Sequence, residues 1–176
     1  MKIGIAGVGG IGSNVAVNLV RGGALWLRIV DFDRVEISNL NRQFYFFDQI
    51  GRLKVEALAE NLGRIRPGLV TQALAERVTG DNCRRLFAGC DLVVEGFDRP
   101  ADKKMLLECL ACDLPVVSAC GIAGSELAGI RTRRIGNCLV AGDLATDCDH
   151  APLFAHKVST VANHLTEAIL NLRRVP

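Results

Sequence analysis

Short apolar runs alternate along the chain with longer stretches in which apolar residues recur every three or four positions. The first pattern is typical of buried strands, and the second is typical of amphipathic helices. The predicted strands occupy residues 2–6, 25–30, 69–74, 91–95 and 115–119. The predicted helices occupy residues 11–21, 54–65, 99–112 and 157–172, with a short extra helix capped by Asp81. This alternation predicts an α/β fold with a doubly wound, mostly parallel sheet of the Rossmann type.

The alternation ends after residue 120. Residues 126–133 and 137–140 follow one another without a helical pattern between them, which predicts an antiparallel pair at the edge of the sheet. Residues 142–152 are polar and are expected to form a mobile loop. Because no internal repeat or linker interrupts the chain, residues 1–176 are interpreted as a single domain.

Composition narrows the class of protein further. The formal net charge of +2 over 176 residues is too small to indicate binding to nucleic acid or to an anionic membrane. No apolar run is long enough to predict a membrane span. The seven cysteines lack paired spacing, which favours free thiols in a reducing, cytoplasmic environment over a disulfide framework.

The clearest motif is a glycine-rich turn between the first strand and the first helix. Gly7, Gly9 and Gly12 fit the pattern G-x-G-x-x-G, and Gly10 lies inside it. In this context the backbone can approach a phosphate, and the helix N-terminus offers free N–H groups to an anion. Asp31 ends the second strand, where an acidic residue is expected to bind ribose hydroxyls. The motif alone leaves NAD, FAD, S-adenosylmethionine-like ligands and ATP open.

A dense polar stretch follows, at a point where a βαβ unit usually turns quickly into a helix. Residues 38–44 read SNLNRQF, shortly after DFD at residues 31–33. The segment GRLK at residues 51–54 and the strand VVEGFD, which ends at Asp98, complete the order of motifs. This order resembles the ubiquitin-activating-type adenylyltransferases, the family of ThiF, MoeB and the eukaryotic ubiquitin-activating enzymes. The resemblance covers residues 3 to about 120 and is closest to short forms of ThiF.

The resemblance implies both an activity and a set of partners. Members of this family use ATP and Mg²⁺ to adenylate the C-terminal glycine carboxylate of a small ubiquitin-fold sulfur carrier, such as ThiS with its Gly-Gly tail. Pyrophosphate is released, and the enzyme is commonly a Rossmann-like homodimer. The resemblance also places Arg42 and Lys54 on the triphosphate as catalytic cations, and Asp98 on the metal.

Physical chemistry agrees with these roles. A carboxylate that attacks a phosphate brings two anions together, so the reaction needs fixed cations and donors. Arg42 can offer a planar fork, Lys54 a point charge, and Asp98 a hard oxygen for Mg²⁺ at the end of a strand. The expected nucleotide-binding set also includes Asp33, Asn39 and Gln43.

Structural roles remain alternatives at the same positions. Arg42 could be a surface residue of a turn, and Lys54 an ordinary solvated lysine in the first turn of a helix. Asp98 could be the N-cap of the following helix, because aspartate is a favoured cap. Ser38 could be a turn former, and Asp33 a loop residue outside the site.

The chain departs from the family's pattern at several positions. Arg99 stands where many members have asparagine, and Lys103 stands where relatives often have arginine. One C-x-x-C pair, Cys109 and Cys112, cannot supply the four ligands of a structural zinc, so zinc is not expected. Cys148 lies between two aspartates, which raise the pKa of a thiol, so no catalytic cysteine is predicted. The N-terminal helix, from which relatives reach ATP across the dimer, is expected to be absent.

Four functions therefore compete. The first is adenylation of a ThiS-like carrier. The second is activation of a different carboxylate by a related enzyme, for example on a modified tRNA nucleoside. The third is an NAD-dependent oxidoreductase, although no hydride-transfer constellation is visible. The fourth is a nucleotide-binding protein without catalysis.

Overall fold

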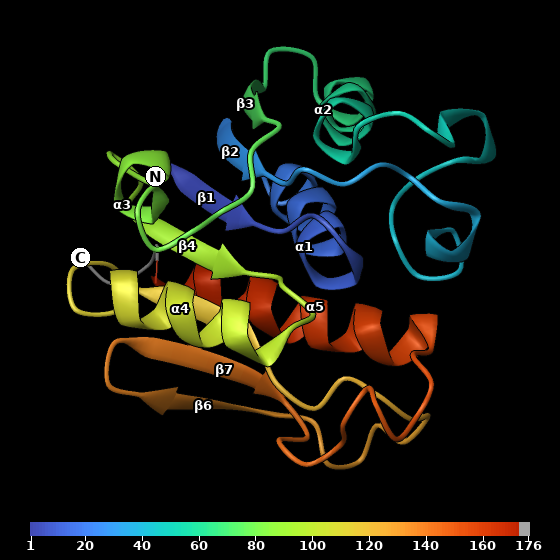
Figure 1. The fold of residues 1–176 in the computed structure, drawn as a ribbon, viewed down its shortest axis with the longest axis vertical. Coiled ribbons are helices and arrows are strands. Elements are labelled where there is room, and N and C mark those ends of the chain that lie inside the picture. The colour runs from blue at the N-terminus through green and yellow to red at the C-terminus, as the bar shows by residue number, and fades with distance from the viewer. Residues whose placement is uncertain (173–176) are drawn as a thin grey trace.

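The computed structural model describes residues 1–172, and the strands in this range form a seven-stranded sheet (Figure 1). The strands are β1 (Ile3–Ala6), β2 (Trp26–Val30), β3 (Val70–Leu74), β4 (Leu92–Glu95), β5 (Val116–Ala119), β6 (Arg131–Ile135) and β7 (Cys138–Gly142). Their order across the sheet is β3-β2-β1-β4-β5-β7-β6. Every neighbouring pair is parallel except β6 and β7. The predicted doubly wound sheet with an antiparallel edge is therefore confirmed.

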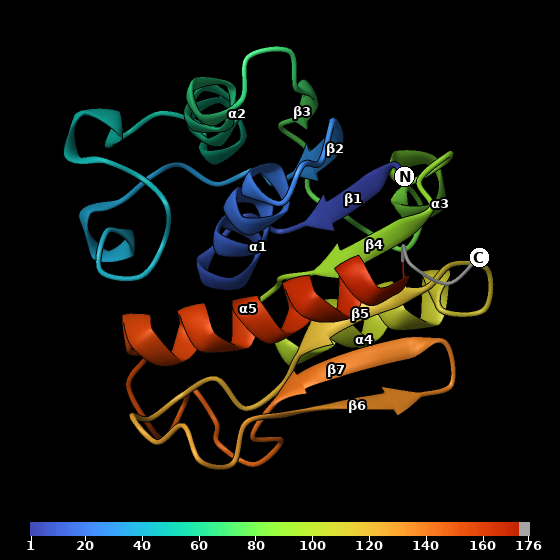
Figure 2. The same cartoon turned by 180° about the vertical axis from the view of Figure 1, so that it is seen from behind.

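Helices cover both faces of the sheet. They are α1 (Gly10–Arg21), α2 (Lys54–Ile65), α3 (Cys83–Leu86), α4 (Pro100–Leu110) and α5 (Ala155–Leu172), with two short 3-10 turns, η1 (Ile37–Asn39) and η2 (Phe47–Gln49). Helices α1, α2 and α5 lie on one face, and α3 and α4 lie on the other (Figures 1 and 2). The longer predicted helices are confirmed, with ends that shift by one or two residues.

The side chains of the central strands alternate between the two faces, as the pleat of a strand requires. Ile3 and Ile5 of β1 belong to the core beneath α1, α2 and α5, whereas Ala6 belongs to the core beneath α3 and α4. In β4, Val94 belongs to the core beneath α1, α2 and α5, and Val93 belongs to the core beneath α3 and α4. Burial on both faces explains why these strands read as continuous apolar runs.

Two boundary predictions are wrong. The first strand of the antiparallel pair begins at Arg131 rather than at residue 126, because its length is fixed by pairing across the turn at Gly136. Asp81 does not cap α3. Asn82 occupies the N-cap position, and its side-chain oxygen accepts a hydrogen bond from the Thr79 amide at 2.8 Å. Asparagine and aspartate are equally good candidates for such a position, so composition could not choose between them.

The carboxyl ends of the parallel strands meet at one edge of the sheet. The excursion between β2 and α2, residues 31–53, gathers at this edge together with the loops that precede β6 and α5 (Figure 1). Open α/β sheets bind their ligands at this edge. A ligand site is therefore expected at this edge.

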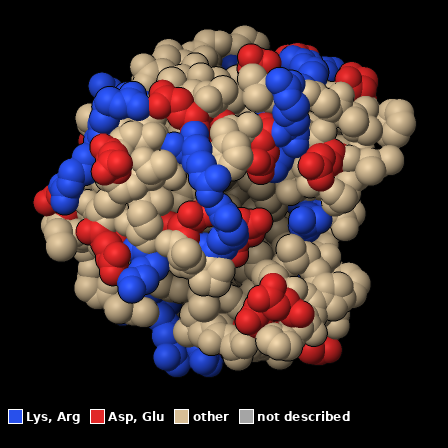
Figure 3. Space-filling view, in the orientation of Figure 1, with Lys and Arg blue, Asp and Glu red and all other residues tan. Residues whose placement is uncertain are grey.

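The outer surface adds two observations. On the face seen in Figure 3, positive and negative side chains are interspersed, and neither sign forms a continuous patch. Within residues 1–172, no helix combines the length and the hydrophobicity that crossing a membrane requires.

Candidate functional site

The glycine turn between β1 and α1 has the geometry of an anion site. Gly7 has φ +84°, a left-handed conformation that favours glycine. A Cβ atom at Gly12 would lie 1.9 Å from the Gly7 carbonyl oxygen, so the close approach of helix to turn also requires glycine. At Gly9, the N-cap of α1, a Cβ atom would meet only the Gln43 Nε2 atom at 3.7 Å. The backbone at Gly9 is therefore open to a phosphate at the helix N-terminus.

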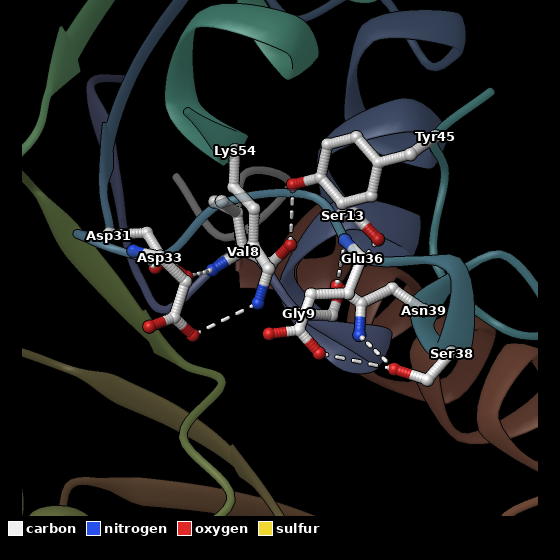
Figure 4. Close-up of polar contacts among 10 residues, drawn as sticks. All are labelled: Val8, Gly9, Ser13, Asp31, Asp33, Glu36, Ser38, Asn39, Tyr45 and Lys54. Carbon is white, nitrogen blue, oxygen red and sulfur yellow. Dashed lines mark hydrogen bonds and ion pairs between the residues drawn. The ribbon is translucent and has the colours of Figure 1, made fainter. Parts of the chain in front are cut away.

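Two buried side chains hold the peptide groups of Val8 from opposite sides (Figure 4). The Asp31 carboxylate accepts a hydrogen bond from the Val8 amide at 2.8 Å, and the Tyr45 hydroxyl donates one to the Val8 carbonyl at 2.7 Å. Burial raises the pKa of Tyr45, which keeps the hydroxyl protonated as a donor. The orientation of the glycine turn is therefore set by β2 and by the polar excursion together.

Asp31 also supports its own segment. Its second oxygen accepts a hydrogen bond from the Asp33 amide at 2.8 Å. Burial raises the pKa of Asp31, while the bonds from the Asp33 and Val8 amides act in the opposite direction. Because both oxygens already accept backbone donors, a ribose hydroxyl would have to share one of them. The contact between Asp31 and ribose stays a prediction.

The polar stretch at residues 38–44 is bonded to the first turn of α1. The Phe44 amide donates to the Ser13 hydroxyl at 3.1 Å, and the Asn14 side-chain amide donates to the Arg42 carbonyl at 2.9 Å. Asn14 also donates to the carbonyl of Gly10 at 2.6 Å. These bonds place the stretch directly against the glycine turn.

Arg42 is the cation that this arrangement brings beside the turn. Its Cγ and Cδ atoms lie 3.8 and 3.9 Å from the position of a Cβ atom at Gly10. The guanidinium donates to the Ser38 carbonyl at 3.0 Å and to the Asn41 side chain at 2.8 Å. Across residues 1–172, no carboxylate forms an ion pair with Arg42. Its charge is therefore available to an anionic ligand.

Gln43 and Asn39 have different surroundings. The Oε1 atom of Gln43 is buried and has no hydrogen-bond partner among the described residues, although a buried oxygen normally has one. A donor from a ligand at the glycine turn would satisfy it. Asn39 instead closes η1: its side-chain oxygen accepts the Glu36 amide at 3.1 Å, and its carbonyl accepts the Gln43 amide at 2.9 Å. The contacts of Asn39 are therefore those of a residue that shapes the excursion.

Lys54 begins α2, as predicted, and its side chain is only 8% exposed. Its ammonium group pairs with the half-exposed carboxylate of Asp33 at 3.0 Å (Figure 4). The structure thus brings Lys54 and Asp33 next to Asp31, but it does not show a free, mobile charge. A triphosphate contact would require Lys54 to exchange its partner, and this contact stays a prediction.

Asp98 is exposed and lies in the turn between β4 and α4. The alternative that it caps α4 is wrong, because Arg99 occupies the N-cap and Pro100 follows it at the start of the helix. No cluster of three or more potential metal ligands exists in residues 1–172. A single carboxylate that acts with phosphate oxygens and waters is nevertheless an ordinary Mg²⁺ donor set, so the residues present fit the ion.

Cys148 is a poor candidate for a nucleophile. Desolvation raises the pKa of its thiol, and the Asp147 carboxylate adds to that rise, whereas Lys103 and Arg42 oppose it. The direction agrees with the expectation from sequence.

Sequence reasoning missed Ser13, Asn14 and Tyr45. The first two are polar residues within the otherwise apolar start of α1, which is a weak signal. Tyr45 is the only tyrosine of the chain, but nothing in the local pattern indicates that its hydroxyl reaches the glycine turn.

The Tyr45→Phe variant is expected to unfold with a free energy about 1–2 kcal/mol lower than that of the parent protein, because the buried Val8 carbonyl loses the hydrogen bond that the Tyr45 hydroxyl donates to it. Chemical denaturation followed by circular dichroism measures this difference. The Thr160→Val variant is the control, because it also removes a hydroxyl that donates to a backbone carbonyl, but at an exposed position. Equal stability of the two variants would contradict the role assigned to Tyr45.

Comparison with known proteins supports the same interpretation of the fold. A model of the ThiF family matches residues 1–163. The chain is 34% identical over 124 residues to the tRNA threonylcarbamoyladenosine dehydratase of Bacillus subtilis, covering 69% of this chain and 49% of that protein. It is 31% identical over 126 residues to the sulfur carrier protein ThiS adenylyltransferase of Escherichia coli, covering 70% of this chain and 50% of that protein. The chain thus spans about half the length of these two relatives.

Among solved structures, the chain resembles the tRNA N6-threonylcarbamoyladenosine dehydratase of Escherichia coli in complex with AMP. The TM-score is 0.83 at 20% sequence identity, and the match covers 99% of this chain and 88% of that chain. At this level of identity, the likeness shows the fold.

Proposed function

The chain belongs to the ThiF family, and from this premise we propose that it uses ATP to adenylate the C-terminal glycine carboxylate of a small ubiquitin-fold sulfur carrier similar to ThiS. Pyrophosphate is the second product. The proposal includes Mg²⁺ as the metal ion, a cytoplasmic homodimer as the working form, and thiamine biosynthesis as the pathway. An E. coli relative named as a ThiS adenylyltransferase supports the choice of carrier.

The observation that carries the proposal is the position of Arg42. A dinucleotide-binding protein needs the glycine turn and Asp31, and it could function without a cation beside Gly10. Arg42 supplies such a cation, and the bond from Asn14 to its carbonyl fixes the backbone that presents it. A site that holds a triphosphate while a carboxylate attacks it requires this additional positive charge.

Each residue has a defined task in the proposed reaction. The amides at Gly9 and Gly10 and the dipole of α1 bind phosphate oxygens, and the unpaired Oε1 of Gln43 accepts a donor from the nucleotide. Arg42, joined by Lys54, offsets the charge that develops as the carboxylate oxygen bonds to the α-phosphorus and the bond to pyrophosphate breaks. Asp98 would hold Mg²⁺, which supplies further neutralisation of phosphate charge. The attacking carboxylate is already ionised at neutral pH, so a general base is not needed.

The test is exchange of labelled pyrophosphate into ATP in the presence of Mg²⁺ and a ubiquitin-fold carrier that ends in Gly-Gly. Exchange is expected with the intact carrier, and it should fall to background when the last glycine is removed. A carrier with an amidated C-terminus is the matched control, because it keeps the tail but lacks the attacking carboxylate.

The competing functions give different results in the exchange assay and in direct measurements of nucleotide binding. Exchange that depends on tRNA containing threonylcarbamoyladenosine, the nucleoside in the name of the B. subtilis relative, would support activation of a nucleoside carboxylate. Binding of NAD without binding of ATP would favour an oxidoreductase. Binding of ATP without exchange under any condition would favour a nucleotide-binding protein without catalysis.

A further inference from the structure

A buried carboxylate lies at the carboxyl end of β4, beside the proposed site. Glu95 is the last residue of this strand and is 0% exposed. It lies in the middle of the sheet, paired in register with Ala6 of β1 and Ser118 of β5. A charge at such a position requires several partners, because burying an unpaired carboxylate is strongly unfavourable.

The partners of Glu95 come from three different elements. The Ser118 hydroxyl donates to Oε2 at 2.5 Å, and the Phe97 amide donates to Oε1 at 2.7 Å. The Lys103 ammonium group, from α4, contacts the two oxygens at 3.1 and 2.9 Å and also donates to the Ala119 carbonyl at 3.3 Å. Glu95 and Lys103 therefore join α4 to the ends of β4 and β5.

The bond to the Phe97 amide closes the turn that carries Asp98. Gly96, inside this turn, donates its amide to the Ala6 carbonyl at 2.8 Å. A Cβ atom at Gly96 would lie 2.7 Å from the Gly7 carbonyl oxygen and 3.2 Å from the Gly12 amide nitrogen. The turn at residues 96–98 therefore packs directly on the glycine turn. The Glu95 carboxylate holds the conformation of the turn at residues 96–98 through its bond with the Phe97 amide.

Stability alone does not explain a charged pair at this position. Replacing a buried ion pair by apolar residues of similar volume is often neutral or stabilising, whereas a paired and hydrogen-bonded carboxylate imposes one geometry on its surroundings. The Glu95–Lys103 pair instead holds the turn at residues 96–98 in one position relative to the glycine turn.

We propose that Glu95 and Lys103 are positioning residues of the adenylation site, which hold the turn at residues 96–98 so that Asp98 is placed for the metal-bound nucleotide. This inference rests on the proposed function, because it assigns Asp98 to the metal. Neither Glu95 nor Lys103 is expected to touch the nucleotide. Both act through Asp98.

A double-mutant cycle tests the inference through binding rather than turnover. Glu95→Gln keeps the shape of the side chain, but it removes the charge that holds Lys103 and weakens the bond from the Phe97 amide, because a neutral oxygen is a weaker acceptor than a carboxylate. We expect the dissociation constant of ATP measured with Mg²⁺ by calorimetry to rise about tenfold in Glu95→Gln and about tenfold in Asp98→Asn, each equivalent to about 1.4 kcal/mol. The double variant should be within about twofold of Asp98→Asn alone, because the two residues act through one contact.

Two further variants separate positioning from general damage to α4. Lys104→Met removes the neighbouring lysine, whose ammonium group is exposed and lies 3.7 Å from Glu108, and it should leave the dissociation constant unchanged. Lys103→Arg keeps a cation that can reach both oxygens of Glu95, and it should stay within about threefold of the parent protein. Hydrogen exchange gives a readout without ligand: the amide of Phe97, which donates to Glu95, should exchange faster in Glu95→Gln, while the amides of the distant strand β3 should not.

The outcomes distinguish this inference from the proposed function. If the parent protein binds ATP but the two losses multiply to about a hundredfold, Glu95 acts independently of Asp98 and the positioning role is overturned. Unchanged amide exchange in Glu95→Gln overturns it as well. A parent protein that fails to bind ATP overturns the proposed function and this inference together. If Glu95→Gln does not fold, Lys103→Gln takes its place in the cycle with the same expected coupling.

Discussion

Replacing Arg42 with alanine is expected to slow carrier-dependent pyrophosphate exchange about 100- to 1,000-fold, the usual loss when one fixed donor to a developing oxyanion is removed. The backbone of residue 42 keeps its bond from Asn14, so the glycine turn and the polar stretch should hold their positions. The loss should therefore appear in the rate and not in the free energy of unfolding. Exchange kinetics and chemical denaturation on the same preparations measure the two quantities.

Two arginine variants sharpen this prediction. Arg42→Lys keeps the charge but loses the planar fork, so its exchange rate should lie between those of the parent protein and Arg42→Ala. Arg52→Ala is the matched control, because Arg52 lies at the end of the same excursion but pairs with Glu60 of α2 at 2.8 Å. An Arg42→Ala protein that exchanges as fast as Arg52→Ala would remove the main support for the proposed chemistry.

Much of the fold was predictable because local pattern and burial agree. Residues such as Ile3, Ile5 and Val94 lie in strands buried on both faces, and such strands read as apolar runs wherever they occur. The helices were predictable from their apolar periodicity. The edge of the sheet was harder to predict, because every residue of β6 is exposed and no apolar pattern marks it. The start of β6 at Arg131 is determined by its pairing with β7.

The site was predictable only where a motif has a fixed relation to the backbone. Gly7, Gly9 and Gly12 follow one another in a single turn, so their spacing predicts their geometry. Tyr45 and Glu95 escaped prediction for the opposite reason: each makes its decisive bond to a residue far away in sequence, Val8 and Ser118 respectively. Such bonds depend on how the helices, strands and loops pack together, and a local sequence pattern does not predict that packing.

The segment after β7 contains one fixed point that its polar composition does not indicate. Residues 142–152 have the composition of a mobile loop, yet Asp143 anchors the start of this segment. Its carboxylate accepts the amides of Ala145 and Thr146, each at 2.8 Å, and pairs with the Lys157 ammonium group at 2.6 Å. A polar residue that is bound to its own loop and to a helix holds the chain, whereas a solvated one leaves it free.

Replacing Lys157, which pairs with Asp143, is expected to lower the stability of the protein more than any other single substitution considered. The residue is 1% exposed, and its ammonium group donates both to Asp143 and to the Ala123 carbonyl, the latter at 2.5 Å. The Lys157→Met variant leaves a largely buried carboxylate without its cation. Loss of one partner from a buried ion pair costs about 3–5 kcal/mol, a large share of the stability of an ordinary domain. Urea denaturation at pH 7 measures the loss.

The pH dependence of the loss follows from Asp143. Burial raises the pKa of this carboxyl, but the bonds from Lys157, Thr146 and Ala145 outweigh that effect and hold the pKa well below its ordinary value. A carboxyl with a depressed pKa in the folded state stabilises the protein above its unfolded pKa of about 3.9, and this contribution is lost as the pH falls further. The difference in unfolding free energy between the parent protein and Lys157→Met should therefore be constant from pH 5 to 8 and should shrink below about pH 4.

A second variant separates the broken pair from the loss of lysine packing. In the Lys157→Met/Asp143→Asn protein no charge is left without a partner, so part of the lost stability should return and the pH dependence below about pH 4 should flatten. Lys104→Met removes an exposed lysine and should change the unfolding free energy by less than about 0.5 kcal/mol. If the double variant is as unstable as Lys157→Met, and equally so at pH 3 and pH 7, then the packing of the lysine stem and not its charge holds this part of the sheet edge. The bond between Asp143 and Lys157 would then be a consequence of the fold and not one of its causes.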